Sequence, residues 1–214
     1  MTNAIAIQMT DVGKRYGPHW VLSRMTLSIQ QGETVALFGR NGSGKTTLLK
    51  IMATLIAPTT GTLEILNRDA SREKREIRSE IRMLGHERQL YDFLTVTENL
   101  RLAAGIRGIP SGEEAIRTSL IRLGLEKVCH RRLGELSEGM KKRTVLARLL
   151  LGEAKIFLLD EPHPTLDQEG KEILNEMIRE WKNQKKTVLL ASHDHEQALE
   201  HADRVIVIES GRLQ

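Results

Sequence analysis

Short apolar runs alternate with amphipathic stretches along much of the chain. Nearly continuous apolar runs of this length are typical of strands buried on both faces of a parallel sheet. These runs are Thr34–Phe38, Ile156–Leu159, Thr187–Ala191 and Val205–Ile208. Helical patterns separate the later runs, at Gln168–Asn183 and His195–Ala202. The alternation predicts an α/β fold with a mostly parallel sheet and helices on both faces.

The first third of the chain carries additional strand signals. These candidates are Ala4–Met9, Met25–Ile29, Thr62–Leu66 and Ile81–Leu84. Lys14–Pro18 has the composition of a turn between the first two. We therefore expect an N-terminal antiparallel β part beside the parallel core. In Ser71–Glu80 acids and bases alternate, which favours an exposed helix over a nucleic-acid patch.

Helical patterns dominate between Thr95 and Leu151. The expected helices are Val96–Ile106, Glu113–Leu123 and Gly139–Leu151. Thr95 and Glu98 form a capping-box pattern before the first helix, and Ser137 is a candidate N-cap for the third. We expect one domain, residues 1–214, in which 1–94 and 152–214 form the α/β lobe and 95–151 a helical lobe.

The composition limits the classes of protein to consider. The chain has 214 residues and a net charge of +4, which suits one α/β domain with a solvated basic surface or a face toward anionic lipid or a partner. Cys129 is the only cysteine, so neither an internal disulfide nor a cysteine metal site is expected. No membrane span or signal peptide is apparent. We expect a soluble protein whose membrane role depends on a partner.

The segment Gly39–Thr46 (GRNGSGKT) matches G-x-x-x-x-G-K-T, the phosphate-binding loop of nucleoside triphosphatases. It lies between a predicted strand and the helical run Thr46–Met52, which is the context that the motif needs. Glycines let backbone N–H groups approach phosphate oxygens, and the helix N-terminus adds its positive dipole end. Lys45 would contact the β- and γ-phosphates, and the Thr46 hydroxyl is a candidate Mg²⁺ ligand.

Polar residues follow two of the buried runs, where α/β sheets bind their ligands. Asp160 can hold Mg²⁺ through water, and Glu161 can polarise or deprotonate a water aimed at the γ-phosphate. Alternatively, this acid pair caps the next helix. His193 can bridge the γ-phosphate and the attacking water, although such a histidine is usually an ordinary polar residue. Tyr16 either stacks on a nucleotide base or lies buried under the sheet edge.

Between the loop and the acid pair lies Leu136–Met140 (LSEGM), followed by Lys141-Lys142-Arg143. With this segment the chain resembles the ATP-binding subunit of ABC transporters, from Tyr16 to Arg212. In that family the segment opens a helix whose N-terminus binds the γ-phosphate of ATP held by the other subunit. The helix dipole and the Ser137 hydroxyl supply the physical reason.

The resemblance implies roles for individual residues. It implies adenine stacking by Tyr16, water activation by Glu161, a switch role for His193 within Ala191–Asp194, and communication between subunits through Pro164–Asp167. The implied ATP-binding residues are Tyr16, Gly39, Arg40, Asn41, Gly42, Ser43, Gly44, Lys45, Thr46, Thr47, Ser137 and Gly139. The implied catalytic residues are Glu161 and His193, and the implied Mg²⁺ ligands are Thr46, Asp160 and Glu87.

The chain departs from the family pattern at three places. Glu138–Met140 replaces the usual Gly-Gly-Gln, and L-S-x-G-M-K-x-R looks like the exporter branch that pairs with compact six-helix membrane subunits. The place of the Mg²⁺-sensing glutamine falls on Glu87 or, with a shift of one residue, on His86, and Gln89 is the third alternative. Pro164 and Thr165 replace a pair of small residues, which would alter communication between the two sites.

The resemblance implies a cytoplasmic ATPase on the inner face of the cell membrane, which uses ATP and Mg²⁺ to power export through a separate membrane subunit. It also implies a second ATPase subunit, as a homodimer or a heterodimer, and no nucleic-acid partner. Gly85–Glu87 and the short chain resemble the haem-exporter ATPase of cytochrome c maturation, and equally drug, lipid or polysaccharide exporters. A soluble ABC ATPase without a transporter and a phosphotransferase are the alternatives. The first usually carries a coiled-coil insert or a second ATPase half, and the second needs an acceptor pocket and no signature.

Overall fold

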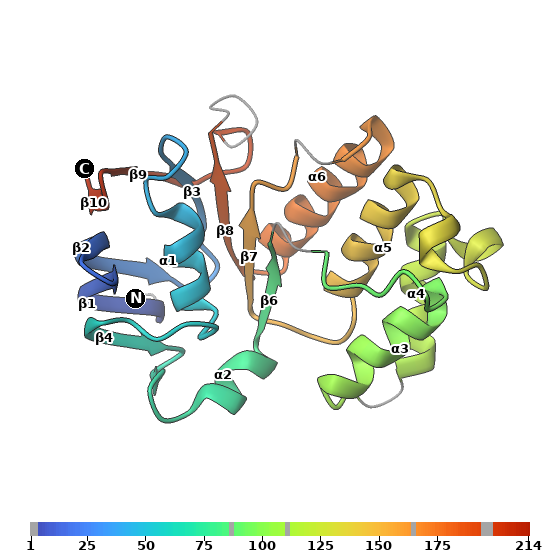
Figure 1. Cartoon of the computed structure of the whole chain (residues 1–214), viewed down its shortest axis with the longest axis horizontal. Helices are drawn as coiled ribbons and strands as arrows, with labels where there is room; N and C mark the ends of the chain where they lie inside the picture. The colour runs from blue at the N-terminus through green and yellow to red at the C-terminus, as the bar shows by residue number, and fades with distance from the viewer. Residues whose placement is uncertain (1–3, 86–87, 110–111, 164–165, 194–198) are drawn as a thin grey trace. The chain divides into compact units, whose positions relative to one another are not determined.

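The computed structural model describes residues 4–85, 88–109, 112–163, 166–193 and 199–214 (Figure 1). The contacts divide the chain into two compact units. The first unit consists of residues 1–85, 154–161 and 178–214, and the second of residues 86–153 and 162–177.

An antiparallel sheet with the strand order β2-β1-β4-β5 forms one layer of the first unit. Its strands are β1 (Ile5–Tyr16), β2 (His19–Gln30), β4 (Thr60–Ile65) and β5 (Arg68–Asp69). The expected turn at Lys14–Pro18 is too long, since Tyr16 pairs with His19 and leaves a two-residue loop. Gly17 has a φ of 56°, which such a tight hairpin loop requires, so the strands run on to the turn.

The second sheet of this unit has the order β10-β9-β3-β8-β7-β6. Its strands are β3 (Thr34–Phe38), β6 (Ile81–Leu84), β7 (Ile156–Asp160), β8 (Thr187–Ser192), β9 (Arg204–Glu209) and β10 (Arg212–Leu213). All its pairs are parallel except β9 with β10, which confirms the mostly parallel core. The carboxyl ends of β3, β7 and β8 therefore meet at one edge, although their residues are far apart in the sequence.

The two faces of the parallel sheet pack on different partners. Leu158 of β7 shares a hydrophobic core with α1 (Lys45–Met52) and with the antiparallel sheet, so α1 lies between the two sheets (Figure 1). The next residue toward the N-terminus, Phe157, points to the other face and stacks on Trp181 of α6 (Gln168–Asn183), with ring centres 3.8 Å apart. The alternation of side chains along a strand explains this division.

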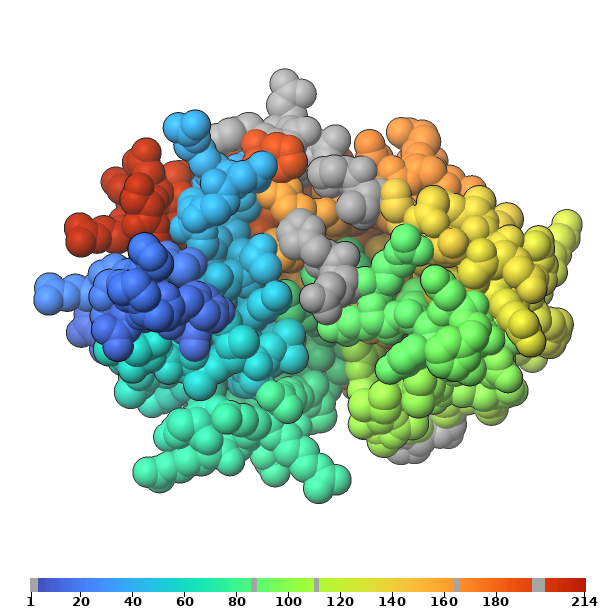
Figure 2. Space-filling view, viewed as in Figure 1, coloured from blue at the N-terminus to red at the C-terminus, as the bar shows by residue number. Residues whose placement is uncertain are grey.

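The C-terminal hairpin returns to the start of the chain. The backbone N–H of Ser23 in β2 donates to the carbonyl of Gly211, between β9 and β10, at 2.8 Å. The space-filling view shows the same neighbourhood, with the red C-terminal residues beside the blue N-terminal strands (Figure 2). The first unit also contains the short helix α2 (Lys74–Ser79). It is shorter than the expected helix Ser71–Glu80 and lies within that range.

The second unit is mainly helical. It contains α3 (Val96–Ile106), α4 (Gly112–Arg122), α5 (Glu138–Leu149), the 3-10 turns Glu126–Val128 and Leu133–Glu135, and the first part of α6. The predicted capping box is present, because the Thr95 hydroxyl accepts from the Glu98 N–H and the Glu98 carboxylate accepts from the Thr95 N–H. The hydrogen bonds that the Glu98 carboxylate accepts from the Thr95 backbone N–H and from the Thr95 hydroxyl hold the pKa of Glu98 below its usual value.

The first half of the predicted helix His195–Ala202, residues 195–198, lies outside the described residues. Within the part of the chain that the structure describes, every helix is too short or too polar to cross a lipid bilayer.

The stacked pair Phe157–Trp181 gives a test of the first unit's core. Trp181 is 5% exposed, so Trp181→Ala should lower the free energy of unfolding by about 3–5 kcal/mol, the usual cost of truncating a buried aromatic side chain. Trp20 is 51% exposed, and Trp20→Ala should cost clearly less. Urea unfolding followed by circular dichroism measures both variants, and equal shifts in the midpoint would contradict this packing.

Candidate functional site

The phosphate-binding loop joins β3 to α1, as the sequence predicts. Gly44 precedes the helix with a φ of 109°, and a Cβ there would collide with the side chain of Leu22. Gly42 has a φ of 79°, and a Cβ there would meet no described atom within 4 Å. Glycine is therefore required at position 42 by the backbone, and at position 44 by the backbone and by its neighbour.

Lys45 begins α1 and is buried, with 6% of its surface exposed. Its ammonium donates to the carbonyl of Gly39 at 2.6 Å and to that of Arg40 at 3.4 Å. It also lies 3.4 Å from Oε1 of Glu161, at the carboxyl edge of the same sheet. The ammonium of Lys45 therefore lies against the phosphate-binding loop, beside Glu161, the acid that follows β7.

Other polar atoms of the loop are available to an anion. The buried Ser43 hydroxyl finds no hydrogen-bond partner in the described part of the chain. Thr46 and Thr47 follow in the first turn of α1 and are half-buried. Unsatisfied buried hydroxyls are rare, and a phosphate oxygen would supply the missing partner. The N-terminus of α1 favours the same anion.

Glu161 is held from two sides. Its Oε2 lies 2.8 Å from Nδ1 of His193 and accepts from the His193 backbone N–H at 3.3 Å, while its Oε1 faces Lys45. Its backbone has a φ of 49°, the left-handed region that non-glycine residues seldom adopt. The structure thus brings together the predicted residues Lys45, Glu161 and His193. Such strain at a charged cluster is typical of functional sites.

The alternative in which the acid pair caps the next helix fails for Glu161. The cap of α6 is Asp167, whose Oδ1 accepts from the backbone N–H of Gly170 at 2.9 Å. Asp160 is the last residue of β7 and is 2% exposed.

Tyr16 lies at the end of β1 rather than in a turn. Its side chain is 51% exposed, which contradicts the alternative of burial under the sheet edge. The ammonium of Lys14 lies 5.2 Å from its ring centre, in a cation–π contact. One aromatic face is thus available on the surface of the first unit.

The signature segment belongs to the second unit. Ser137 is the N-cap of α5, and its hydroxyl accepts from the Met140 N–H at 3.3 Å, as expected. Gly139 packs against the carboxylate of Asp167, so a Cβ at position 139 would overlap that group. A close approach of Asp167 therefore requires glycine there.

Arg88 is a residue that the sequence interpretation missed. Its guanidinium pairs with Glu138 at 3.0 Å, and Lys141 reaches the other carboxylate oxygen at 3.1 Å. The Lys141 hydrogen bond first, and then the charge of Arg88, lower the pKa of Glu138. Lys141 is three residues away on the same helix and could have been predicted. Arg88 could not, because the tertiary fold brings it to Glu138.

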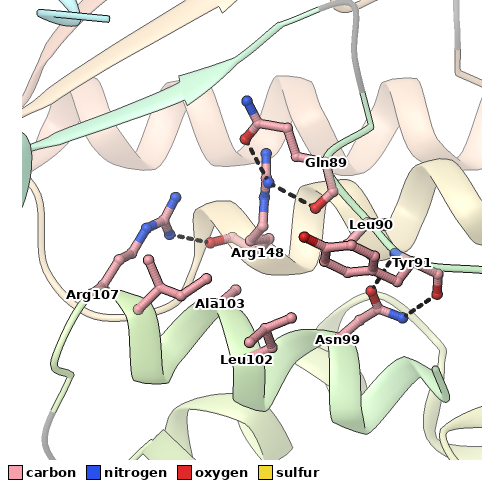
Figure 3. A pocket seen from close by; sticks show the side chains of 9 residues that line it. Gln89, Leu90, Tyr91, Asn99, Leu102, Ala103, Arg107 and Arg148 are labelled. Atoms are coloured by element: carbon pink, nitrogen blue, oxygen red, sulfur yellow. Dashed lines mark hydrogen bonds between the residues drawn. The ribbon is translucent and has the colours of Figure 1, made fainter.

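Several other predicted residues lie outside the described part of the chain, namely His86, Glu87, Pro164, Thr165 and Asp194. Gln89, the third alternative for the Mg²⁺-sensing position, is described. Its side-chain oxygen accepts from the Arg148 guanidinium at 2.8 Å (Figure 3).

The donor set at the sheet edge fits Mg²⁺. Thr46 and Asp160 offer a hydroxyl and a carboxylate, the hard oxygen ligands that Mg²⁺ prefers. Among the described residues no group of three or more His, Cys, Asp or Glu side chains is placed to hold a metal ion. Mg²⁺ would therefore depend on water and nucleotide phosphates for its remaining ligands, as is usual for this ion.

Comparisons with known proteins show which family the chain belongs to. The family model described as "ABC transporter" matches residues 22–164. The Nod factor export ATP-binding protein I of Rhizobium etli is 33% identical, over 97% of this chain and 66% of that protein. The aliphatic sulfonates import ATP-binding protein SsuB of Zymomonas mobilis is 37% identical, over 98% of this chain and 84% of that protein.

A solved structure extends the likeness to the fold. It is a dimeric ATP-binding cassette in a post-hydrolysis state with ADP and Pi, 29% identical, with a TM-score of 0.87 over 97% of this chain and 96% of that chain. The family model covers more than half of the sequence, and the family hydrolyses ATP. The chain therefore belongs to the ABC transporter family, as an ATP-binding and ATP-hydrolysing subunit.

Proposed function

We propose that the chain powers transport by a separate membrane subunit, with two copies that bind two ATP molecules between them. The observation that carries the proposal is the cluster of Lys45, Glu161 and His193 beside the phosphate-binding loop. The dimer formed by the solved relative and the transport functions in the relatives' names support it.

Hydrolysis begins with an exchange of partners by Lys45. The oxygens of a bound triphosphate are stronger hydrogen-bond acceptors for the Lys45 ammonium than the carbonyls of Gly39 and Arg40. When the ammonium turns to the β- and γ-phosphates, Oε1 of Glu161 is released to accept a proton from the attacking water. His193 keeps its contact with Oε2 and so fixes the orientation of the carboxylate. Thr46, Asp160 and Glu87 would hold Mg²⁺, which neutralises charge on the phosphates.

The second copy completes each site. Ser137 and Gly139 at the start of α5 would face the γ-phosphate bound by the partner subunit, where the helix N-terminus stabilises negative charge. Tyr16 would stack on the adenine through its exposed face. ATP then joins the two subunits, and hydrolysis releases them. A ligand at 100 times its Kd stabilises its bound state by about 2.7 kcal/mol, so two sites suffice to shift a two-state interface.

Export is the direction that the signature favours, because L-S-x-G-M-K-x-R is similar to the exporter branch. The relatives include both an export and an import subunit, so the direction is a prediction. Haem export in cytochrome c maturation is a narrower prediction that rests on the resemblance of Gly85–Glu87 and of the short chain to that exporter. The partner surface proposed for the membrane subunit is the helical lobe with the loop around Glu87.

Replacement of Lys45 tests the nucleotide site. Lys45→Ala should raise the Kd for ATP by on the order of 10²-fold, because charge-assisted hydrogen bonds to two phosphates are lost. Lys50→Ala, in the same helix, is the matched control and should leave the Kd unchanged. Isothermal titration calorimetry measures both, and unchanged binding by Lys45→Ala would refute the assignment.

Replacement of Glu161 tests the chemistry. Glu161→Gln should still bind ATP but lose about 10²–10⁴-fold in turnover, the usual contribution of a general base. It should also accumulate as an ATP-bound dimer on size exclusion. Glu64→Gln, an exposed acid on β4, should hydrolyse ATP normally. Near-normal phosphate release by purified Glu161→Gln would exclude the role of general base.

The transport role itself is tested by membrane association. The chain should co-purify with membranes when a membrane subunit encoded beside it is co-expressed, and it should remain in the soluble fraction when that subunit is omitted. ATP hydrolysis without any such association would instead support a soluble ABC ATPase with no transporter.

A further inference from the structure

An acid lies at the start of α5, where the proposed dimer needs a positive surface. Glu138 is the first residue of the helix, between Ser137 and Gly139, and its side chain is 57% exposed. A carboxylate in the first turn stabilises its own helix through the helix dipole. The same charge opposes any other anion at this helix end, because both compete for one positive pole. In the proposed dimer, the γ-phosphate of the partner subunit therefore approaches a like charge.

Each oxygen of the Glu138 carboxylate contacts a cation of its own. Nη2 of Arg88 lies 3.0 Å from Oε2, and the ammonium of Lys141 lies 3.1 Å from Oε1. The hydrogen bond from Lys141, and then the charges of Arg88, Lys141 and Lys142, lower the pKa of Glu138. The acid is therefore charged at neutral pH, and a phosphate can approach it only where cations offset its charge.

A second acid lies at the same helix start. Asp167 packs so closely against Gly139 that a Cβ at position 139 would overlap its carboxylate. The two lysines of α5 that act on Glu138 match these two acids in number but do not exceed them. Arg88 supplies the further positive charge that lets this group of side chains attract an anion.

The Arg88–Glu138 pair lies on the surface, which limits its contribution to folding. Arg88 is 44% exposed, and ion pairs between solvent-exposed side chains add little to stability. Arg88 precedes α3 in the chain, so only the tertiary fold brings it to α5. The main effect of the pair is therefore on the charge that the start of α5 presents to a ligand.

We propose that Arg88 is a positioning residue for ATP hydrolysis, which holds and neutralises Glu138 so that the start of α5 can accept the γ-phosphate bound by the partner subunit. The inference rests on the proposed ATP-linked dimer and adds to it a residue outside the signature segment. Arg88 acts through Glu138 rather than on the nucleotide itself. Without Arg88, the acid repels the γ-phosphate and weakens the closed dimer.

The first experiment measures the ATP-bound dimer of the full chain in the Glu161→Gln background, which separates assembly from hydrolysis. Arg88→Gln should raise the dissociation constant of this dimer by on the order of 100-fold, because each of the two equivalent sites loses about tenfold to one unpaired like charge. Sedimentation equilibrium with ATP and Mg²⁺ measures the constant. Arg101→Gln, which removes an exposed ion pair with Glu113 in the same unit, is the matched control and should leave the dimer unchanged.

Binding of ADP shows whether the variant is folded. ADP has no γ-phosphate, and Arg88 lies outside the phosphate-binding loop of its own chain. The Kd of Arg88→Gln for ADP with Mg²⁺, measured by isothermal titration calorimetry, should therefore equal that of the parent chain. A loss of ADP binding equal to the loss of dimer affinity would show a general structural defect and would overturn the inference.

A second substitution separates the proposed role from two others. Glu138→Gln alone should dimerise at least as tightly as the parent, and Arg88→Gln combined with Glu138→Gln should return the dissociation constant to that of the parent, because the like charge is gone. If Arg88 only stabilised the fold, both single changes would weaken the dimer. If Arg88 bound the phosphate directly, removal of the Glu138 charge would restore nothing. Either result overturns the inference.

The same variants with Glu161 intact report on turnover. Arg88→Gln should lower the rate of ATP hydrolysis, and the double variant should recover it. An ATP-bound dimer of unchanged affinity in the Arg88→Gln variant would exclude the inference while the proposed function stands. If the Glu161→Gln chain forms no ATP-bound dimer at all, the proposed function fails together with the inference.

Discussion

The position of the Lys45 ammonium is the constraint on which the rest of the site depends. It is buried where β3 ends, and it contacts two carbonyls of its own loop and the carboxylate of Glu161. A triphosphate must compete with all three acceptors. Binding of the nucleotide and release of the catalytic carboxylate therefore become a single event in our proposal, because one cation serves both.

Glu161 illustrates how the fold supports this cation. The left-handed backbone at Glu161 and the contact with His193 hold a carboxylate beside the loop rather than at the N-terminus of α6. The helix receives its cap from Asp167 instead. Because Asp167 also packs on Gly139, the start of α5 and the start of α6 constrain each other within the second unit.

The second unit contains an acid that two cations neutralise and two arginines that contact no described carboxylate. Glu138 is an acid where the family usually has glycine, and Arg88 with Lys141 neutralises it on the surface. Arg107 and Arg148 are left without a described counter-ion in an apolar groove. In our proposal, the first arrangement keeps the charge of Glu138 from opposing the phosphate at the start of α5.

Much of the fold and part of the site follow from the sequence alone, because local rules act there. The apolar runs predict the parallel strands, and the Thr95–Glu98 pattern predicts its capping box. The spacing of Gly39–Thr46 predicts the phosphate-binding loop between β3 and α1. Only the tertiary structure decided the contacts between distant segments. It extended β1 to Tyr16 through the pairing with β2, joined Glu161 to Lys45 and His193, and brought Arg88 to Glu138. Such contacts depend on which strands and helices become neighbours, and periodicity along the chain does not contain that information.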